Sequence, residues 1–405
     1  MNLSYFIAQR IKVKQGNGFS STIHQIAVAS IAIGLAIILV SFLIFGGFKK
    51  TISDKVFNLA GHYQVSKYTL VEDFEEPPIS KRSEFYEQVG DYPFVSHVQT
   101  YAHKAGLLKG EEEVDGVILK GVEANFDTLR FQPLIQSGRM IDFSDSNAIN
   151  QIVLSEKIAN RMQLAVGDRV LMYFVQDPPR FRRLTVVGIY NSALEEFDNR
   201  LVIGHLDLIR RLNGWSEDQV GGYEVFINQA EEIEARTAAL VDILDFDLKL
   251  ERSTDKYMEI FDWLTLIGRN VRIFLVLIVF VACFNMVSIL FILIMERTQM
   301  IGLLKSMGAT HRLISRIFVF NGVKIVLKGL LIGNVIGQGF GLLQYQFRLI
   351  PLDPANYYMT YVPIAWDWLM IIALNVLVFT SVALVQFLPT VIISGISPIK
   401  AIKFD

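Results

Sequence analysis

Four long apolar segments constrain the fold of this chain more than any other feature of its sequence. A helix needs about 20 apolar residues to cross the hydrocarbon core of a bilayer, and each segment is close to that length or longer. The whole chain is 52% hydrophobic and 19% charged, which excludes an ordinary soluble protein. We therefore expect an α-helical membrane protein with four transmembrane helices. The segments are Ile26–Phe45, Val271–Ile294, about Ile325–Leu343 and Trp368–Ile393.

Charge distinguishes the segments that connect these spans. Residues 47–270 carry 36 Asp and Glu against 25 Lys and Arg, although Lys49 and Lys50 directly follow the first span. The stretch before the first span has three basic residues and no acidic one, and residues 295–318 have four basic and one acidic. Short cytoplasmic loops are rich in Lys and Arg. This pattern predicts cytoplasmic N- and C-termini, a cytoplasmic loop at 295–318 and an external domain at 47–270.

The expected organisation alternates spans with cytoplasmic and external segments. The first residues have apolar side chains at helical spacing with basic residues between them, which is typical of a helix on the membrane surface. In order, we expect an interfacial helix at 1–24, a span at 25–46, the external domain at 47–270, a span at 271–294, a cytoplasmic segment at 295–318, a span at 319–343, an external loop at 344–366, a span at 367–393 and a cytoplasmic tail at 394–405.

The external domain has the pattern of mixed α and β structure. Alternating polarity predicts strands and helical periodicity predicts helices, and their alternation indicates an α+β domain of two lobes, the second inserted at about 124–214. Ser155 is expected to cap the helix that follows it. Strands are predicted at His62–Tyr68, Val95–Leu108, Val114–Val122, Gln151–Leu154, Arg169–Val175, Arg182–Tyr190 and Tyr223–Ile227, and helices at Lys81–Val89, Ser155–Met162, His205–Leu212 and Ala230–Leu244.

A short hairpin is predicted at residues 173–184, where two strand-like runs flank Asp177-Pro178-Pro179. Proline fixes φ and stiffens such a tip. Arg180, Arg182 and Arg183 lie beside the tip in an otherwise acidic domain. Two interpretations remain open: a solvated hairpin without a partner, and a docking site for an acidic partner surface.

Residues 295–309, between the second and third spans, are predicted to form a short amphipathic helix. Ile301, Leu304 and Met307 fall on one helical face, and Arg297 and Lys305 lie elsewhere on it. Such a helix either lies at the membrane surface or docks into a partner. In the third span, Gly329, Gly333, Gly337 and Gly341 recur every four residues. This small-residue stripe allows close helix contact, either within the chain or in a homodimer.

The sequence contains no recognised catalytic motif. It lacks a Walker motif, HExxH, GxSxG and any paired Cys–His pattern, and its single cysteine, Cys283, lies in the second predicted span. The predicted cytoplasmic segments are too short to form a catalytic domain. We therefore expect a chain that is not an enzyme and holds no metal or cofactor. Any energy that it uses must come from a partner, and residues 295–309 are the expected contact.

Four motifs along the chain together resemble the type VII ABC transporter permeases, the family of MacB, FtsX and the lipoprotein-releasing LolC/LolE proteins. Residues 295–309 resemble the cytoplasmic coupling segment of that family, and Gly47-Phe48 resembles the end of its first helix. Gln151–Tyr173 resembles part of its extracytoplasmic lobe, and Pro389 with Ser397–Ile402 resembles its C-terminal end. A large external domain without a fused ATPase is most similar to the LolC/LolE branch.

The resemblance implies a permease in the bacterial inner membrane that extracts lipoproteins and releases them to a LolA-like periplasmic carrier. A separate LolD-like ATPase would supply the energy from ATP and Mg²⁺. A second permease subunit would complete a homodimer or a LolC/LolE-type heterodimer. Two alternatives are a MacB-like mechanotransmitting efflux permease and an FtsX-like scaffold that controls a periplasmic hydrolase.

The resemblance also assigns expected roles to residues. The hairpin here is shorter than the carrier-binding hook of LolC-type proteins, which leaves both LolC-like and LolE-like roles open. Coupling to the ATPase is expected at Glu296, Arg297, Gly302, Lys305, Met307 and Gly308; an apolar cavity for acyl chains at Val40, Leu43, Ile44, Phe48, Phe261, Leu264, Ile267, Phe274 and Ile278; and carrier docking at Pro178, Pro179, Arg180, Arg182 and Arg183.

Overall fold

The chain forms two compact units in its computed structural model, which describes residues 19–69, 76–110, 113–145, 147–176, 178–353 and 357–390. The helical unit comprises residues 1–50, 263–351 and 361–405, and the sheet unit comprises residues 51–262 and 352–360. Most of the expected interfacial helix, the tail at 394–405 and the motif Ser397–Ile402 lie outside the described residues.

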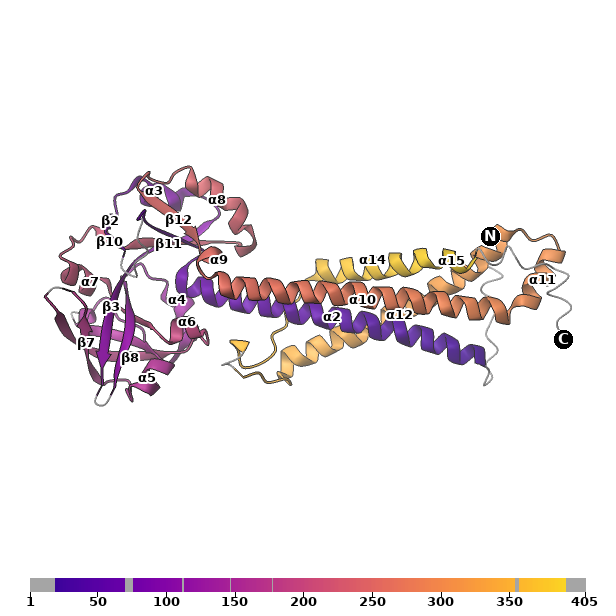
Figure 1. The fold of residues 1–405 in the computed structure, drawn as a ribbon, viewed down its shortest axis with the longest axis horizontal. Coiled ribbons are helices and arrows are strands. Elements are labelled where there is room, and N and C mark those ends of the chain that lie inside the picture. The colour runs from indigo at the N-terminus through magenta and orange to yellow at the C-terminus, as the bar shows by residue number, and fades with distance from the viewer. Residues whose placement is uncertain are drawn as a thin grey trace. The chain divides into compact units, whose positions relative to one another are not determined.

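Four of the described helices are long and apolar enough to cross a membrane, which confirms the predicted number of spans (Figure 1). Helix α10 begins at Met258, before the second apolar segment. Helix α2 was not expected to continue past Gly46-Gly47. The four helices are α2 (Phe19–Ala60), α10 (Met258–Glu296), α12 (His311–Phe347) and α14 (Trp368–Val385); two short ones are α11 (Thr298–Ser306) and α15 (Phe387–Thr390).

Gly47 lies inside α2 because another segment of the helical unit passes against it. A Cβ atom at position 47 would lie 2.4 Å from the carbonyl oxygen of Pro363. The glycine therefore permits a close backbone approach between α2 and the segment that leads into α14. In this place it does not end the helix.

The glycine stripe of α12 packs against α2 within the chain. A Cβ at Gly329 would lie 2.8 Å from Ile31, and one at Gly337 would lie 3.1 Å from Leu39. Small residues let two helix backbones approach closely and gain van der Waals contact. Of the two interpretations of the stripe, the structure supports contact within one chain.

Amide side chains add polar links between helices of the helical unit. Asn334 on α12 donates from Nδ2 to Oδ1 of Asn375 on α14 at 2.6 Å, and Asn375 donates in return at 3.1 Å. Asn285 on α10 donates to the Ser30 hydroxyl on α2 at 2.8 Å. Such bonds satisfy polar groups that lipid cannot satisfy, and they fix the pairing of the helices.

The sheet unit is built on a 10-stranded sheet in the order β12-β1-β11-β3-β4-β9-β6-β8-β5, in which β7 pairs with β3 and β8. All seven predicted strands are confirmed within a few residues, and β5, β9 and β12 of this sheet were not predicted. The strands are β1 (Tyr63–Lys67), β3 (Val95–Lys109), β4 (Val114–Val122), β5 (Ile135–Gly138), β6 (Gln151–Ser155), β7 (Arg169–Phe174), β8 (Arg180–Tyr190), β9 (Leu201–His205), β11 (Gly222–Ile227) and β12 (Leu248–Arg252); β2 (Ile79–Ser80) pairs separately with β10 (Gln219–Val220).

Seven of the described short helices belong to the sheet unit, and α3, α5, α7 and α8 contribute to its apolar core. Ser155 caps α5 as predicted, because its side chain accepts a hydrogen bond from the amide of Ile158 at 3.1 Å. The helices are α3 (Glu84–Gln88), α4 (Thr128–Phe131), α5 (Glu156–Arg161), α6 (Glu195–Asp198), α7 (Leu206–Asn213), α8 (Ile233–Val241) and α9 (Ser253–Lys256), with 3₁₀ turns at Val89–Asp91, Gln132–Leu134, Ala148–Asn150 and Ala230–Glu232.

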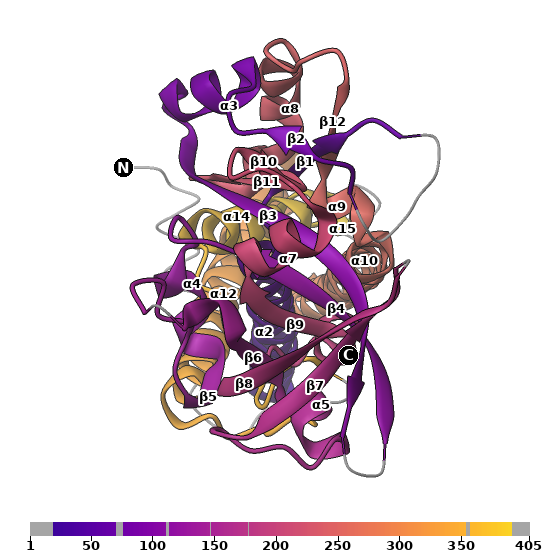
Figure 2. The same cartoon turned by 90° about the vertical axis from the view of Figure 1, so that its left-hand side faces the viewer.

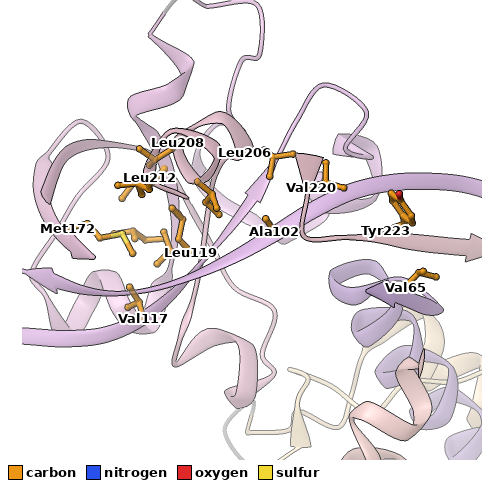
Figure 3. Close-up of a cluster of buried hydrophobic side chains, with 14 of the residues drawn as sticks. Val65, Ala102, Val117, Leu119, Met172, Leu206, Leu208, Leu212, Val220 and Tyr223 are labelled. Carbon is orange, nitrogen blue, oxygen red and sulfur yellow. The ribbon is translucent and has the colours of Figure 1, made fainter. Parts of the chain in front are cut away.

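One long strand joins the two halves of this sheet. The first half of β3, up to Tyr101, pairs with β11, and its second half, from Ala102, pairs with β4 and β7 (Figure 2). The expected lobe boundary at Ala124 therefore differs from the structure, because β3 and β4 precede it and pair with strands that follow it. One continuous apolar core lies along this sheet, and Figure 3 shows part of it, including Leu119 and Met172.

Candidate functional site

The short helix α11 is held against the ends of its two neighbours by a small apolar cluster. Ile301 is fully buried and packs with Ile294 at the end of α10 and with Ile314 and Phe318 near the start of α12. Leu304 packs against the same cluster. In Figure 1, α11 lies at the end of the helical unit where α10 ends and α12 begins. The predicted amphipathic helix is therefore present, and its apolar side is used inside the chain.

Gly308 ends this helix in a left-handed conformation. Its φ is +90°, which L-residues with a side chain rarely adopt. The amide of Ala309 donates to the Leu304 carbonyl at 2.9 Å, which closes the last turn. No atom of the described residues lies within 4 Å of a Cβ placed at position 308. Within this chain, the glycine serves backbone conformation and not close packing.

A second, exposed apolar pair lies on the other side of α11. Leu303 is 58% exposed and Met307 is 76% exposed, and residues four apart share one side of a helix. The expectation that Met307 lies on the same face as Ile301 is wrong, because six residues turn a helix by about 240°, and Met307 is exposed where Ile301 is buried. Leu303 was not predicted at all. The sequence does carry a signal for Leu303, because this segment has more apolar residues than one narrow helical face can hold.

The other expected coupling residues are distributed around α11. Glu296 is exposed at the end of α10, and Arg297 is the N-cap residue of α11 and is partly buried. Gly302 is buried beside Ile301, and Lys305 lies in the last turn. The exposed surface available to a partner therefore includes Glu296 but not Gly302. The coupling role of all six residues stays a prediction.

The nine expected cavity residues do not share one surface. Leu43 is 3% exposed and lies against Gly341 of α12, and Leu264 is also buried. Phe261 belongs to the sheet unit, where its ring stacks on Phe57 with centroids 5.7 Å apart. Phe274 is exposed. The remaining members are partly buried: Val40, Ile44, Phe48, Ile267 and Ile278.

Helix α10 has an exposed apolar face that is larger than the expected cavity residues indicated. Its large side chains extend over several helical turns, and none of the described residues packs against them closely enough to bury them. Within a membrane-spanning helix, such side chains face lipid or another subunit. They are Ile273, Phe274, Val276, Leu277, Phe280, Val281 and Phe284.

The three arginines of the β7–β8 hairpin are held in different ways. Arg180 donates from Nη1 to the carbonyl oxygens of Arg211 and Leu212, both at 3.3 Å, at the C-terminal end of α7. This is the favourable position for a cation near a helix C-terminus. Arg182 and Arg183 are adjacent in β8 and so project to opposite faces. Pro178 and Pro179 are exposed at the tip. The hairpin exists as predicted, and its arginines do not form a single patch.

One tether in the sheet unit was not predicted. The ammonium of Lys55 on α2 donates to the carbonyl oxygens of Ser192 and Tyr358, both at 2.7 Å. Ser192 is fixed in turn by Asp198, whose carboxylate accepts bonds from the Ser192 amide and hydroxyl. Burial raises the pKa of Asp198 above its ordinary value despite these bonds. One side chain therefore joins α2, the turn after β8 and the segment between α12 and α14.

Two family models match the chain in succession. The first is described as the MacB-like periplasmic core domain and matches residues 26–243. The second is described as the FtsX-like permease C-terminal domain and matches residues 272–398. The first match alone covers more than half of the chain.

Curated relatives align over most of their length. The chain is 25% identical to the "Lipoprotein-releasing system transmembrane protein LolC" of Neisseria meningitidis, over 87% of each chain. It is 23% identical to the protein named LolE of Haemophilus influenzae, over 83% of this chain and 82% of that one. A LolC of Xylella fastidiosa is 21% identical over 98% of this chain and 97% of that one.

Proposed function

We propose that this chain, a member of the family that joins a MacB-like periplasmic core domain to an FtsX-like permease C-terminal domain, is a permease that releases lipoproteins. It would act as the membrane subunit of an ABC transporter. The names of its full-length relatives, LolC and LolE of the lipoprotein-releasing system, support this function. Its four spans and basic short loops support a place in the bacterial inner membrane, with both termini in the cytoplasm.

The observation that carries the proposal is the two-sided helix α11. Ile301 fixes the helix to the ends of α10 and α12, and Leu303 and Met307 remain exposed on its other side. A partner bound to that exposed side would move α11 and the two long helices together. This arrangement suits a chain that receives mechanical work and does not hydrolyse a nucleotide itself.

The expected partner at α11 is a LolD-like ATPase, which would bind ATP and Mg²⁺ in its own chain. Energy is required because each methylene of an acyl chain that leaves the membrane for water costs about 0.8 kcal/mol. Several chains per lipoprotein make spontaneous extraction unfavourable. Closure of the helices on ATP binding would force the acyl chains out of an apolar cavity.

Two further partners complete the proposal. A second permease subunit, identical or LolC/LolE-related, would cover the exposed apolar face of α10 that includes Phe274 and Phe280, and would close the acyl-chain cavity. A LolA-like periplasmic carrier would receive the cargo at the β7–β8 hairpin. The residues expected to contact it are Pro178, Pro179, Arg180, Arg182 and Arg183, of which all but Arg182 are exposed.

Depletion of the chain in its own bacterium tests the function. We expect lipoproteins to accumulate in the inner membrane, measured by separating the two membranes and following acylated cargo. Expression of the intact chain from a second copy should restore the normal distribution. Unchanged lipoprotein sorting after depletion would contradict the proposal. Co-purification with a periplasmic adaptor would then favour a MacB-like exporter, and binding of a hydrolase to the sheet unit would favour an FtsX-like scaffold.

A further inference from the structure

The two faces of the sheet differ in polarity. Val65 and Tyr223 point into the apolar core (Figure 3), and because side chains alternate along a strand, Gln64 and Glu224 lie on the opposite face. That second face carries a row of polar residues in register across four strands. The row is Glu251 on β12, Gln64 on β1, Glu224 on β11 and Gln99 on β3.

A buried ion pair lies at the centre of this face. Lys120 Nζ is 2.6 Å from Glu224 Oε1, and the two side chains are 3% and 0% exposed. Gln99 donates to the other carboxylate oxygen at 2.7 Å, and Lys120 also donates to the Leu59 carbonyl at 2.5 Å. A buried pair of this kind is often less stable than apolar residues of the same volume. Stability of the fold is therefore a weak reason for its presence.

This face lines a cavity of about 770 Å³ within the sheet unit. Sites for small ligands typically have volumes of about 300–1,000 Å³. Leu59 in the last turn of α2, Phe197 in α6 and Tyr257 after α9 also line the cavity, and the ring centroids of Phe197 and Tyr257 are 5.0 Å apart. The lining includes five Lys and Arg residues and five Asp and Glu residues.

The balance of charges selects the class of ligand. A phosphate group would meet carboxylates close to the cations, because Lys120 lies 2.6 Å from Glu224 and Lys249 lies 3.7 Å from Glu251. Among the described residues, no three His, Cys, Asp or Glu side chains converge on a position that could hold a metal ion. An extended peptide offers amide donors and carbonyl acceptors in alternation, together with side chains of both signs. An extended peptide can therefore form hydrogen bonds and ion pairs with a lining that is neutral overall and has many donors and acceptors.

We infer that this cavity binds a short, extended, polar segment of the cargo polypeptide, an assignment that rests on the proposed release of lipoproteins. The sheet unit would then bind the polypeptide part of the cargo, and the helical unit would bind its acyl chains. The cavity also includes residues at the end of α2 and just before α10. Binding of a segment there would therefore contact the end of α2 and the residues that lead into α10.

The test measures binding of a fluorescein-labelled peptide of alternating Ser, Lys, Gly and Glu to the full chain in nanodiscs. We expect saturable binding that is tighter than for all-Lys or all-Glu peptides of the same length. The double variant Lys249→Gln with Glu251→Gln should weaken binding about tenfold, because it removes one cationic donor and one anionic acceptor from the wall. Both side chains are partly exposed, so the variant should fold.

A matched control uses another partly exposed pair of the sheet unit. Glu232 and Arg236 form an ion pair at 2.7 Å outside the cavity, and the double variant Glu232→Gln with Arg236→Gln should bind the peptide normally. Equal binding by the Lys249/Glu251 variant and the intact chain would overturn the inference. Displacement of the peptide by glycerophosphoethanolamine or inorganic phosphate would also overturn it, in favour of a lipid headgroup or a free anion.

Failure of this inference and failure of the proposed function are distinguishable. Peptide binding is measured without transport, and lipoprotein sorting after depletion is measured without the peptide. Accumulation of lipoproteins on depletion, with no peptide binding, would overturn only the cavity assignment. Peptide binding that depends on Lys249 and Glu251, with unchanged lipoprotein sorting, would support a peptide site and overturn the release function.

Discussion

Gly333 on α12 lies so close to Ala32 on α2 that a Cβ at position 333 would be 2.8 Å from the Ala32 carbonyl oxygen. We predict that Gly333→Ala destabilises the helical unit by about 1–3 kcal/mol, because overpacking forces the two backbones apart. Gly339 on the same helix provides the control, since a Cβ there would have no atom of the described residues within 4 Å. Unfolding in mixed detergent should show a loss for Gly333→Ala and none for Gly339→Ala. Equal stability of the two variants would contradict close packing of α2 on α12.

The tether at Lys55 predicts a local loss of order. Lys55→Met removes both donated bonds, and hydrogen bonds from charged groups each contribute about 1.5–3 kcal/mol. We expect faster amide hydrogen exchange in residues 352–360 and around Ser192, with slow exchange retained in β6. The same substitution at Lys49, which is exposed on the same helix, should leave exchange unchanged. Protection of both segments in Lys55→Met would show that other contacts hold them.

The two sides of α11 should respond differently to a charge. Leu303→Glu and Met307→Glu should reduce cargo-stimulated ATP hydrolysis by the partner ATPase about tenfold, with little change in melting temperature, because both positions are exposed. Ile301→Glu should lower the melting temperature, because it buries an unpaired charge. The measurements are ATPase rate and thermal unfolding of the purified complex. Normal coupling in the exposed variants would mean that α11 only contacts the membrane surface.

Gly308 allows conformation to be separated from contact. Gly308→Val should cost about 1–2 kcal/mol and weaken coupling, because a β-branched residue is strained at positive φ. Gly308→Asn should retain most coupling, since Asn tolerates the left-handed region. Exchange of Glu296 and Arg297 is expected to uncouple ATP hydrolysis from transport without unfolding the sheet unit. An equal loss of coupling in the Val and Asn variants would indicate that a partner approaches the backbone of Gly308 closely. The left-handed turn alone would then not be sufficient for coupling.

His62 predicts a pH dependence in the sheet unit. Burial, reinforced by the positive charge of Arg130, lowers the pKa of His62 to about 4 from 6.5. The unfolded chain therefore binds a proton between these values that the folded chain does not. This contribution to stability is present above pH 6.5 and is lost as the pH falls toward 4, with a total on the order of 3 kcal/mol.

Denaturant unfolding of the intact chain between about pH 7.5 and 4.5 measures this effect. His62→Phe should reduce the loss of stability in that range. Phe57→Leu removes the ring that stacks on His62, at a centroid distance of 4.3 Å, without removing the titrating group. It should lower stability at every pH and keep the slope. An unchanged slope in His62→Phe would assign the pH dependence to other groups.

Elements with strong local signals were predicted well from the sequence. Strand Val114–Val122 has the predicted bounds, because it is rich in β-branched residues and the acidic Glu112-Glu113 directly precedes it. Strand β9 was missed because four of its five residues, Leu201–Gly204, are buried, so it shows no alternation. A fully buried strand and a short loop of apolar residues look alike in one sequence.

The site residues were harder to predict, because their positions depend on contacts between distant segments. Met307 was expected on the face of Ile301, but six residues turn a helix by about 240°, and Met307 lies exposed with Leu303. In the sequence, Lys55 looks like an ordinary surface lysine. Only the fold brings the carbonyl groups of Ser192 and Tyr358 within hydrogen-bonding distance of it. The polar row through Gln64 and Glu224 is likewise formed by register between strands far apart in the chain.

The continuous strand β3 has a mechanical consequence. Its residues up to Tyr101 bond to β11, and its residues from Ala102 bond to β4 and β7. The same strand is therefore hydrogen-bonded into both halves of the sheet, so a hinge between the halves would have to bend the extended backbone of β3 and break ladder bonds beside Tyr101 and Ala102. The sheet unit should respond to load as a single stiff body and should not survive division into two separately expressed pieces.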